Sequence, residues 1–274
     1  MTTLTAEPIV RSRLLSEVPG LVHGFTTRAL GSMAGQLHAA DEQARNRARL
    51  EARIGMRLVK ASQVHSADVA LVVNGTATRL RDGHSEPASN AMRLEADALI
   101  TRDRGVALAV AVADCASILV ATPDGWIGAA HAGWEGATRR IAVAMCEAIA
   151  ERGGRVDEAR GAIGPAICGA CYAIDAARAA VIHERLGDSG SLGGPFGDRH
   201  HFDIPRELAA QLRDAGVPRV DDMRRCTKDE VETFFSHRGE NGTAGRGLAF
   251  IGRPSATTSN DELERRNPPA KERP

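Results

Sequence analysis

Two histidines and one cysteine are the side chains of this sequence best suited to hold a metal ion. They are His65, Cys115 and His131. Imidazole and thiolate are preferred zinc ligands, and a catalytic zinc has three protein ligands with an open fourth position, whereas structural sites usually close all four. If these side chains converge, the sequence predicts a metal centre that does chemistry more than one that supports the fold.

A predicted β-hairpin would bring Cys115 and His131 together. Two apolar segments flank the sequence Thr-Pro-Asp-Gly, whose residue types are typical of a tight turn. We expect Ala121 to pair with Trp126. Counting outward then places Ala116 opposite His131, with Cys115 one residue further along. The Cβ atoms of facing residues are about 4.5–5.5 Å apart, so this thiolate and imidazole could share one ion.

Ordinary roles remain open for each of these residues. A cysteine near a strand is commonly a small buried hydrophobe, and a histidine commonly has an ordinary hydrogen-bond partner. The neighbours favour a site, because Asp114 precedes Cys115 and small residues follow His131 where a continued strand would be expected. Local patterns are broken in this way at functional sites. Asp114 is predicted either to orient a ligand imidazole or to be a simple turn residue.

Composition limits the classes of partner. The 274 residues carry no net charge and only 3% are aromatic, so neither a polyelectrolyte partner nor base stacking along single-stranded nucleic acid is expected. Residues 1–20 lack the apolar core of a secretory signal, and no apolar stretch reaches transmembrane length without a charge. We therefore expect a cytoplasmic protein without a membrane or nucleic-acid partner.

The five cysteines are an odd number, which favours reduced thiols or metal ligands over a disulfide framework. Cys168 and Cys171 form a C-x-x-C pair, but no second such pair follows and the setting of a thioredoxin helix is missing. On its own the pair is a weak zinc or redox signal, and a structural role is favoured.

The hydrophobic pattern predicts helices and strands in alternation, in one large domain or two tightly fused halves. Strands are expected at 22–27, within 59–73, and at 96–101, 106–113, 118–121, 126–130, 161–167 and 248–251; helices are expected at 40–55, 136–152, 175–186 and from 203 to about 216. Residues 74–93 are predicted to be a polar loop, residues 187–199 a mobile Gly-rich loop, and residues 253–274 a disordered tail.

A series of short motifs runs from His23 to Ile251. They are His23-Gly24-Phe25-Thr26-Thr27-Arg28, Asn46-Arg47, Gln63-Val64-His65, Glu95-Ala96-Asp97-Ala98-Leu99, Ala113-Asp114-Cys115, His131-Ala132-Gly133-Trp134, Ala162-Ile163-Gly164-Pro165, Cys226-Thr227, Phe234-Phe235-Ser236 and Gly245-Arg246. Together and in this order they resemble the YfiH-like family, long labelled laccase-domain or polyphenol oxidase proteins. The resemblance implies an α/β catalytic domain at residues 21–252, with layered β-sheets flanked by helices and kinship to certain toxin deamidases. An N-terminal extension of residues 1–20 would precede it.

The resemblance also implies zinc bound by His65, Cys115 and His131, and action on purine nucleosides. Members are described as phosphorolysing adenosine, inosine and guanosine to the free base and ribose 1-phosphate, with adenosine deamination as a side activity. The older oxidase label fits less well, because the nine histidines are scattered and include no His-x-His pair. Copper could still occupy the three ligands adventitiously, since it outranks zinc in the affinity series. We expect a monomer or a weak dimer.

Three departures from the family pattern fall where a nucleoside or phosphate would be handled. The stretch after Arg28 is short and lacks the usual Ser-Leu-Asn-Leu. Glu135 follows the His-Ala-Gly-Trp motif where arginine is typical, and Ala173 stands where glutamate is typical. An arginine near the metal would grip phosphate with two hydrogen bonds, whereas a glutamate would repel it. Arg28, Arg139 or Arg246 could supply the lost positive charge.

Five further side chains are candidates for substrate contacts. Arg28 and Arg246 could hold an anion, with surface salt bridges as the alternative. Gln63 could hydrogen-bond the base or the ribose, or be a solvated strand residue. Tyr172 and Phe235 could stack on the base, and each is at least as well explained as a core residue.

Three functions are consistent with the sequence. The leading one is zinc-dependent purine nucleoside phosphorolysis, with His65, Cys115, His131 and Asp114 as the catalytic residues. The second is a Cys–His amidase or deamidase acting on a cell-wall precursor or another amide, with Cys115 as the nucleophile and a histidine as the base. The third is a metal- or nucleoside-binding protein in which Glu135 marks lost catalysis.

Overall fold

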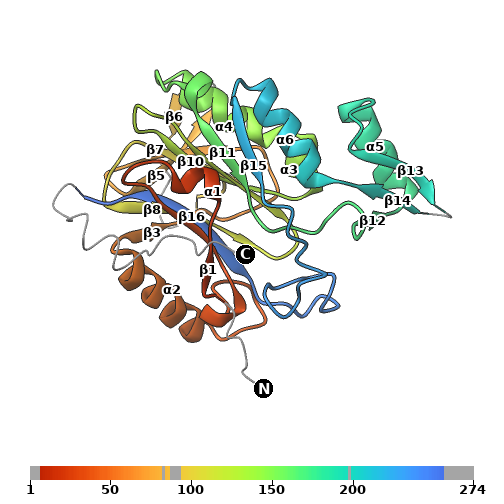
Figure 1. Ribbon diagram of the computed structural model, residues 1–274, viewed down its shortest axis with the longest axis horizontal. Coiled ribbons are helices and arrows are strands. Elements are labelled where there is room, and N and C mark those ends of the chain that lie inside the picture. The colour runs from red at the N-terminus through yellow and green to blue at the C-terminus, as the bar shows by residue number, and fades with distance from the viewer. Residues whose placement is uncertain (1–6, 82–83, 87–93, 197–198, 256–274) are drawn as a thin grey trace.

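Two β-sheets packed face to face form the centre of the molecule (Figure 1). The structure is a computed structural model, and it describes residues 7–81, 84–86, 94–196 and 199–255. The five-stranded sheet has the order β1 (Ile9–Val10), β2 (Val22–Thr26), β16 (Gly247–Arg253), β8 (Val106–Val112) and β3 (Arg57–Val59). The eight-stranded sheet has the order β15 (Arg219–Asp222), β11 (Arg160–Ile163), β9 (Ala116–Ala121), β10 (Ile127–Ala132), β7 (Ala98–Thr101), β4 (Val69–Val73), β5 (Thr76–Arg81) and β6 (His84–Glu86).

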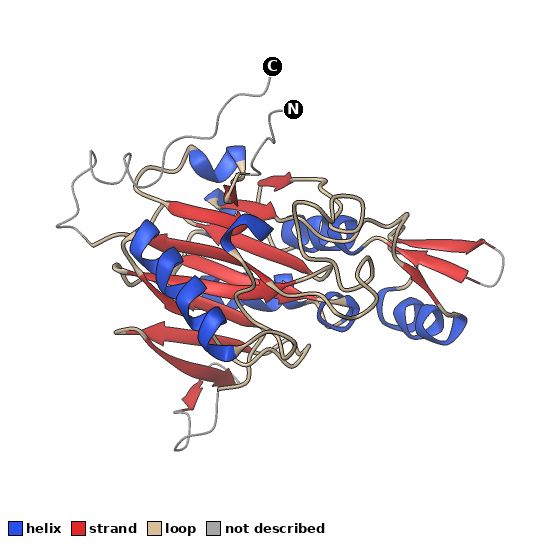
Figure 2. Cartoon of the chain, turned by 90° about the horizontal axis from the view of Figure 1, so that it is seen from below, coloured by secondary structure: helices blue, strands red, loops and turns tan. Residues whose placement is uncertain are grey.

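Helices cover the outer face of each sheet, so the strands lie between α2 (Ala40–Ile54) below and α3 (Trp134–Thr138), α4 (Ile141–Ala150) and α6 (Ile204–Asp214) above in Figure 1. In Figure 2, seen from below, a helix crosses in front of the strands. On the five-stranded sheet, α2 packs Leu50 and Ile54 against Phe250. The eight-stranded sheet is covered by α3, α4 and α6. The predicted α/β class, with layered sheets flanked by helices, is confirmed. No helix in the described part of the chain is long and apolar enough to cross a bilayer.

A small third sheet lies at the side of the two main sheets, to the right in Figure 1. It has the order β12 (Ala173–Ile174), β14 (Arg199–Phe202) and β13 (Leu192–Phe196), and α5 (Ala176–Leu186) accompanies it. α5 begins where it was predicted, because the Asp175 side chain accepts a hydrogen bond from the Arg178 N–H at 2.7 Å and so caps the helix.

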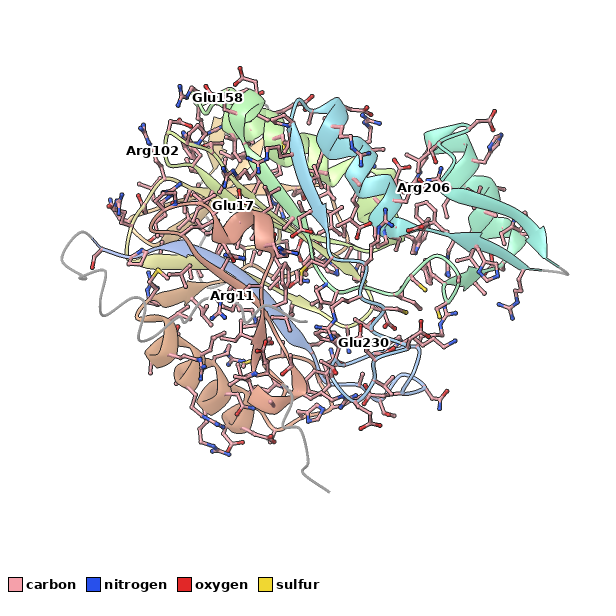
Figure 3. All side chains as sticks on the ribbon, viewed as in Figure 1. Arg11, Glu17, Arg102, Glu158, Arg206 and Glu230 are labelled. Carbon is pink, nitrogen blue, oxygen red and sulfur yellow. The ribbon has the colours of Figure 1, made fainter. Side chains whose placement is uncertain are left out.

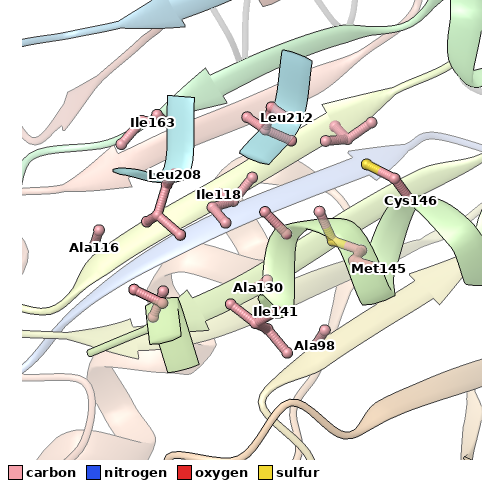
Figure 4. Packing of buried hydrophobic residues seen from close by; sticks show 14 of the residues in the cluster. Ala98, Ala116, Ile118, Ala130, Ile141, Met145, Cys146, Ile163, Leu208 and Leu212 are labelled. Atoms are coloured by element: carbon pink, nitrogen blue, oxygen red, sulfur yellow. The ribbon is translucent and has the colours of Figure 1, made fainter. Parts of the chain in front are cut away.

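The strands β9 and β10 are buried on both faces, and their side chains alternate between two apolar clusters. Leu119 and Ala129 face the five-stranded sheet, whereas Ile118 and Ala130 face the helices on the other side (Figure 4). Truncating a fully buried isoleucine such as Ile118 to alanine costs about 2–5 kcal/mol, so this double burial holds the hairpin firmly. Because successive side chains point to opposite faces, His131 points into the space between the sheets.

The hairpin forms in a register one residue away from the predicted one. Ser117, rather than Ala116, lies opposite His131. The cause is the turn, because the Thr122 N–H donates to the Trp126 carbonyl at 2.9 Å and these two residues close the loop. The predicted pairing of Trp126 with the residue before Thr122 is therefore wrong.

Part of the predicted loop 74–93 is regular structure, namely β5 and β6. Asn74 and Gly75 have φ angles of 52° and 71° and form a two-residue turn between β4 and β5. Asn-Gly is the strongest short-range signal of such a hairpin, because both positions require left-handed backbone. Residues 82–83 and 87–93 lie outside the described residues.

The predicted helix 136–152 is two helices, α3 and α4. Arg140 between them has a φ of 59°, a left-handed conformation that side-chain-bearing residues seldom adopt. The break leaves α3 beside the end of β10 and lets α4 pack Ile141 into the core. The apolar pattern runs through both helices, so it gave no sign of the break.

The Gly-rich segment 187–199, predicted to be a mobile loop, contains β13 and the first residue of β14. The glycines obscured the alternation on which a strand prediction depends. Residues 197–198 lie outside the described residues.

Residues assigned to the N-terminal extension, 1–20, take part in the fold. β1 pairs with β2, and Leu15 of α1 (Arg13–Ser16) is fully buried. Residues 1–6 and 256–274 lie outside the described residues, so of the predicted tail only the start is described. There Arg253 is buried and ends β16. The domain limits themselves stay a prediction.

Candidate metal centre

The three predicted metal ligands lie together at one end of the space between the sheets. His131 is in β10, Cys115 directly precedes β9, and His65 lies in the loop between β3 and β4. Their ligand atoms all lie within 4.8 Å of one another, and the two imidazole rings are 5.0 Å apart at their centroids. We call this group the His65 trio. The shifted register does not separate it, because Cys115 lies in the turn beyond the paired residues.

The backbone at the trio takes unusual conformations. His65 and Asp114 have φ angles of 61° and 79°, and left-handed backbone costs about 1–2 kcal/mol for a residue with a side chain. A Cβ atom on Gly133 would lie 3.1 Å from the His65 Cδ2 atom and 3.2 Å from the Cys115 sulfur. Glycine at position 133 therefore gives two of the ligands the room to converge.

The buried carboxylate of Asp97, directly before β7, holds two ligands in place. Its Oδ1 accepts a hydrogen bond from His131 Nδ1 at 2.8 Å, which leaves His131 Nε2 for an ion. Its Oδ2 accepts from the N–H groups of Val64 at 3.1 Å and Ser66 at 2.7 Å, on either side of His65. The motif that contains Asp97 does not predict this role, because nothing local identifies the partners of a buried carboxylate.

Asp114 does not orient a ligand imidazole as predicted; Asp97 does. The Oδ1 of Asp114 accepts from the hydroxyls of Thr227 at 2.6 Å and Ser236 at 2.7 Å. Its Oδ2 accepts from the Arg238 N–H at 2.6 Å. Asp114 therefore ties the turn before Cys115 to the distant segment 227–238.

The charges of the trio are coupled. Burial acts to raise the pKa of Cys115, but the positive charge and hydrogen bonds of His131 and His65 outweigh it and lower that pKa to about 6. Burial acts to lower the pKa of His131, but the Cys115 thiolate and Asp97 raise it to about 9. A hydrogen bond with Cys115 raises the pKa of His65 against the opposing effect of burial. The lowered pKa of Cys115 and the raised pKa of His131 favour a thiolate beside a protonated imidazole when no metal is bound.

This donor set fits a soft divalent cation. One thiolate and two imidazoles suit zinc, and copper also accepts them. The lowered pKa of Cys115 reduces the cost of forming the thiolate, whereas His131, whose pKa is raised, must release a proton before its Nε2 can bind a metal. Three protein ligands leave a further position for water or substrate. The assignment of the trio as metal ligands remains a prediction that this arrangement supports.

Two cavities meet at the trio, and His65 and Cys115 line both of them. The first, here the Trp134 cavity, has a volume of about 350 Å³ and its wall includes Asp114, Trp134, Glu135, Tyr172, Arg178 and Arg238. The second, here the Gln63 cavity, has a volume of about 460 Å³ and its wall includes Lys60, Gln63, His131 and Arg246. Reactants could therefore reach the trio from two sides.

Three of the five predicted substrate contacts line these cavities. Tyr172 lines the Trp134 cavity, whereas Gln63 and Arg246 line the Gln63 cavity. The amide of Gln63 already donates to the Ala111 carbonyl at 2.8 Å and accepts from the Ala111 N–H at 2.7 Å. The Gln63 side chain thus pairs with the backbone of β8 at Ala111 as a neighbouring strand would. Only the hydrogen-bonding capacity that this pairing leaves unused is available for a ligand.

The other two, Arg28 and Phe235, pack against each other away from the cavities. The Arg28 guanidinium forms an ion pair with Glu240 and lies 4.4 Å from the centroid of the Phe235 ring. Phe235 is only 7% exposed. Neither residue lines either cavity in the described part of the chain, so the predicted anion-binding and stacking roles do not fit this geometry.

Three residues of the Trp134 cavity, namely Trp134, Arg178 and Arg238, were given no binding role from the sequence. The guanidinium of Arg178 lies 5.2 Å from the Trp134 ring centroid, and that of Arg238 lies 5.4 Å from the Tyr172 ring centroid. A positively charged guanidinium therefore lies near each of the two aromatic rings. The negatively charged Glu135 lines the same cavity. These residues come from α3, α5 and a loop after β15, so no local pattern joins them.

Known proteins resemble this chain over most of its length. The family model described as multi-copper polyphenol oxidoreductase laccase matches residues 22–254. A purine nucleoside phosphorylase from Deinococcus radiodurans is 35% identical over 260 residues, which cover 90% of this chain and 93% of that protein. Adenosine deaminase RL5, from an unknown prokaryotic organism, is 33% identical over 202 residues, which cover 71% of this chain and 74% of that protein.

A solved structure has the same fold. YlmD from Geobacillus stearothermophilus superposes with a TM-score of 0.78 at 31% identity, covering 92% of this chain and 98% of that chain. The resemblance inferred from the motifs is therefore confirmed, and relatives named as phosphorylase and deaminase give family-level support for an enzyme. Since the matched residues span both main sheets and the trio, this chain belongs to the multi-copper polyphenol oxidoreductase laccase family of YfiH-like proteins.

Proposed function

We propose that this protein is a zinc-dependent purine nucleoside phosphorylase that acts on adenosine, inosine or guanosine. Phosphate would form the new bond to the ribose C1′ atom, and the purine N9 would keep the electrons of the broken bond and take up a proton. The observation that carries the proposal is the His65 trio at the junction of two cavities, one of which combines aromatic faces with arginines. Relatives named purine nucleoside phosphorylase support the same reading.

The Trp134 cavity offers the contacts that a nucleoside and a phosphate need. The rings of Trp134 and Tyr172 suit the flat face of a purine. Arg178 and Arg238 bring planar guanidinium groups that can hold a phosphate with paired hydrogen bonds. Glu135 stands where arginine is typical of the family, so a positive charge is missing at that position. Arg178 and Arg238 supply this charge, in place of the candidates Arg28, Arg139 and Arg246 considered from the sequence. Arg139 itself lies 3.7 Å from Glu135 as its ion-pair partner.

The residues around the trio have separate tasks in this proposal. His65, Cys115 and His131 would hold zinc, which when bound supplies Lewis-acid polarisation of a phosphate or water oxygen. Asp97 keeps His131 in the tautomer that presents Nε2. Asp114 positions Arg238 through the hydrogen bond from its backbone N–H.

The experiment is a product assay on zinc-loaded protein with each of the three nucleosides, with and without phosphate. Phosphate-dependent release of the free base together with ribose 1-phosphate is expected, and it should disappear in Cys115→Ala. Cys146→Ala is the matched control, because Cys146 is buried in α4 and lines neither cavity. Absence of phosphate-dependent base release from all three nucleosides would remove this function.

One observation favours a second candidate, a Cys–His amidase or deamidase. Cys115 has a pKa of about 6 because His131 and His65 outweigh the effect of burial, and a thiolate beside an imidazole is an activated nucleophile. Metal dependence separates the two candidates. Amide or amidine hydrolysis that survives a chelator and is lost on alkylation of Cys115 would favour the nucleophile. Phosphate-independent conversion of adenosine to inosine that requires zinc would indicate deamination at the metal instead.

A further inference from the structure

We propose that Cys168, Cys171, Cys226 and Asp229 bind a second zinc ion, with a structural role. We call these residues the Cys168 cluster. Their ligand atoms all lie within 4.8 Å of one another. This site is separate from the His65 trio in its residues, and the proposal does not depend on the proposed function.

Two short turns supply the four ligands. Cys168 and Cys171 belong to one turn, closed by the Cys171 N–H donating to the Cys168 carbonyl at 3.0 Å. Cys226 and Asp229 repeat the same spacing in a second turn, in which the Glu230 N–H donates to the Cys226 carbonyl at 2.9 Å. The sequence thus holds a C-x-x-C followed by a C-x-x-D, which resembles the paired turns of structural zinc sites.

The two turns are already joined around the sulfurs. The Cys168 N–H donates to the Cys226 sulfur at 3.4 Å, and the Cys171 thiol donates to an Asp229 oxygen at 3.3 Å. An N–H that points at a sulfur stabilises the negative charge of a metal-bound thiolate. Cys226 is buried and the other two cysteines are half-buried, which limits access of water to an ion. None of the three cysteines is in a disulfide, so each sulfur is available to bind a metal once it is deprotonated.

The donor set favours zinc in a closed site over a redox pair. Three sulfurs and one carboxylate oxygen complete the four ligands that structural zinc takes, so no position remains for a substrate. On binding, the thiols release their protons to solvent and no oxidant or reductant is needed. A cysteine with a packing role alone behaves differently, as Cys146 shows by lying among apolar side chains in the core (Figure 4).

An ion here would fix one wall of the Trp134 cavity. The first turn lies between Ile167 and Tyr172, and both of these residues line that cavity. The second turn contains Thr227, whose hydroxyl bonds Asp114 at 2.6 Å. Figure 3 labels Glu230, which directly follows this turn. The ion would therefore join two segments that are far apart in sequence and that both reach the cavity.

The test is the zinc content of protein purified with reductant and zinc, measured by elemental analysis. We expect two ions per chain in the wild type, one in Cys115→Ser, one in the double variant Cys168→Ser/Cys171→Ser, and none in the triple variant. Cys146→Ala removes a cysteine outside both groups and should keep two ions. A wild type with one ion that Cys115→Ser removes would overturn the proposal.

Cobalt substitution keeps the test decisive if the double variant does not fold. In Cys115→Ser loaded with cobalt, the one remaining ion should show the intense near-ultraviolet absorption of several thiolate ligands. Asp229→Asn changes only an exposed ligand, and it should lower the cobalt affinity of this site at least tenfold while the protein stays folded. A Cys115→Ser protein without that absorption, or with a Cys168–Cys171 disulfide in its mass spectrum, would contradict the site.

Discussion

The His65 trio and the Cys168 cluster use similar donor atoms in different settings. The trio lies at the end of strands buried on both faces, and the buried carboxylate of Asp97 fixes one ligand and the loop of another. The Cys168 cluster lies on two turns outside the sheets, and one of its donors, Asp229, is exposed. The trio borders two cavities, whereas the cluster adjoins the wall of the Trp134 cavity through Ile167 and Tyr172, and its Cys168 lines a separate cavity.

If both groups bind zinc as proposed, their difference implies that ligand type alone does not decide what a metal site does. The number of protein ligands and the residues that hold them would then decide it. Three donors that are held from behind by a carboxylate, next to open space, leave a position for a reactant. Four donors on two loops leave no such position for a reactant. The free energy of metal binding would instead stabilise the folded conformation of the two loops.

Loss of a trio ligand is expected to have the largest effect on activity. A bound Lewis acid contributes several kcal/mol to the transition state, so Cys115→Ser should lower kcat/KM about 10³-fold, at 1.36 kcal/mol per factor of ten. Steady-state assays with inosine and phosphate measure it. The double variant Cys168→Ser/Cys171→Ser is the comparison, and its kcat/KM should fall much less than that of Cys115→Ser. Equal loss in both variants would remove the distinction between a catalytic and a supporting site.

The support behind the trio comes next. Asp97→Asn should weaken zinc binding at the trio about 10–100-fold, because the carboxylate that orients His131 is lost. Asp114→Asn is the matched control, since its partners are Thr227, Ser236 and the Arg238 N–H. It should lower the melting temperature and leave zinc affinity within about threefold. Chelator competition gives both affinities. A larger affinity loss in Asp114→Asn would show that Asp114 orients the ligand.

The position of the phosphate can be tested with two arginines, one from each cavity. Arg238→Met should raise the KM for phosphate about tenfold, the equivalent of one charge-assisted hydrogen bond. Arg246→Met, in the Gln63 cavity, should change it less than threefold if phosphate enters beside Trp134. The reverse result would place the anion in the Gln63 cavity.

The smallest effect concerns the pH dependence of alkylation in metal-free protein. The lowered pKa of Cys115 means that its thiolate is present over a wider pH range, so its rate with iodoacetamide should rise with a midpoint near pH 6 and level off above about pH 7. Burial raises the pKa of Cys171 and of Cys226, so these should react severalfold more slowly at pH 7. Mass spectrometry of proteolytic peptides measures the extent of alkylation at each cysteine. His131→Ala should move the Cys115 midpoint upward, since it removes the neighbouring positive charge, and an unmoved midpoint would contradict that coupling.

Long apolar segments made much of the fold predictable. The hairpin around residues 122–126, the strands flanking it and the helix that ends before Gly55 follow from hydrophobic spacing and turn residues. The failures occur where a backbone conformation overrides that spacing. Arg140 breaks a helix that its sequence pattern would continue. Asn74 and Gly75 form a hairpin turn whose dipeptide signal was overlooked in a polar stretch.

The metal-ligand side chains of the candidate site could be predicted from the sequence. The residues that position those ligands or complete the Trp134 cavity could not. His65, Cys115 and His131 stand out because imidazole and thiolate are rare and chemically distinctive. Asp97 acts on residues more than thirty positions away in sequence, and Arg178 and Arg238 reach the Trp134 cavity from a helix and a loop. Such contacts depend on how distant segments pack, so no local pattern contains them.

The partition formed by His65 and Cys115 has a consequence for how this protein can change. Because each cavity has mostly its own wall residues, a substitution beside Trp134 leaves the Gln63 side untouched, and the converse also holds. Since the proposed function places both nucleoside and phosphate beside Trp134, a substitution in the wall of the Gln63 cavity can alter that approach to the trio without touching the residues proposed to bind them. The Gln63 side can therefore change while the two imidazoles, the thiol and the proposed binding residues stay as they are.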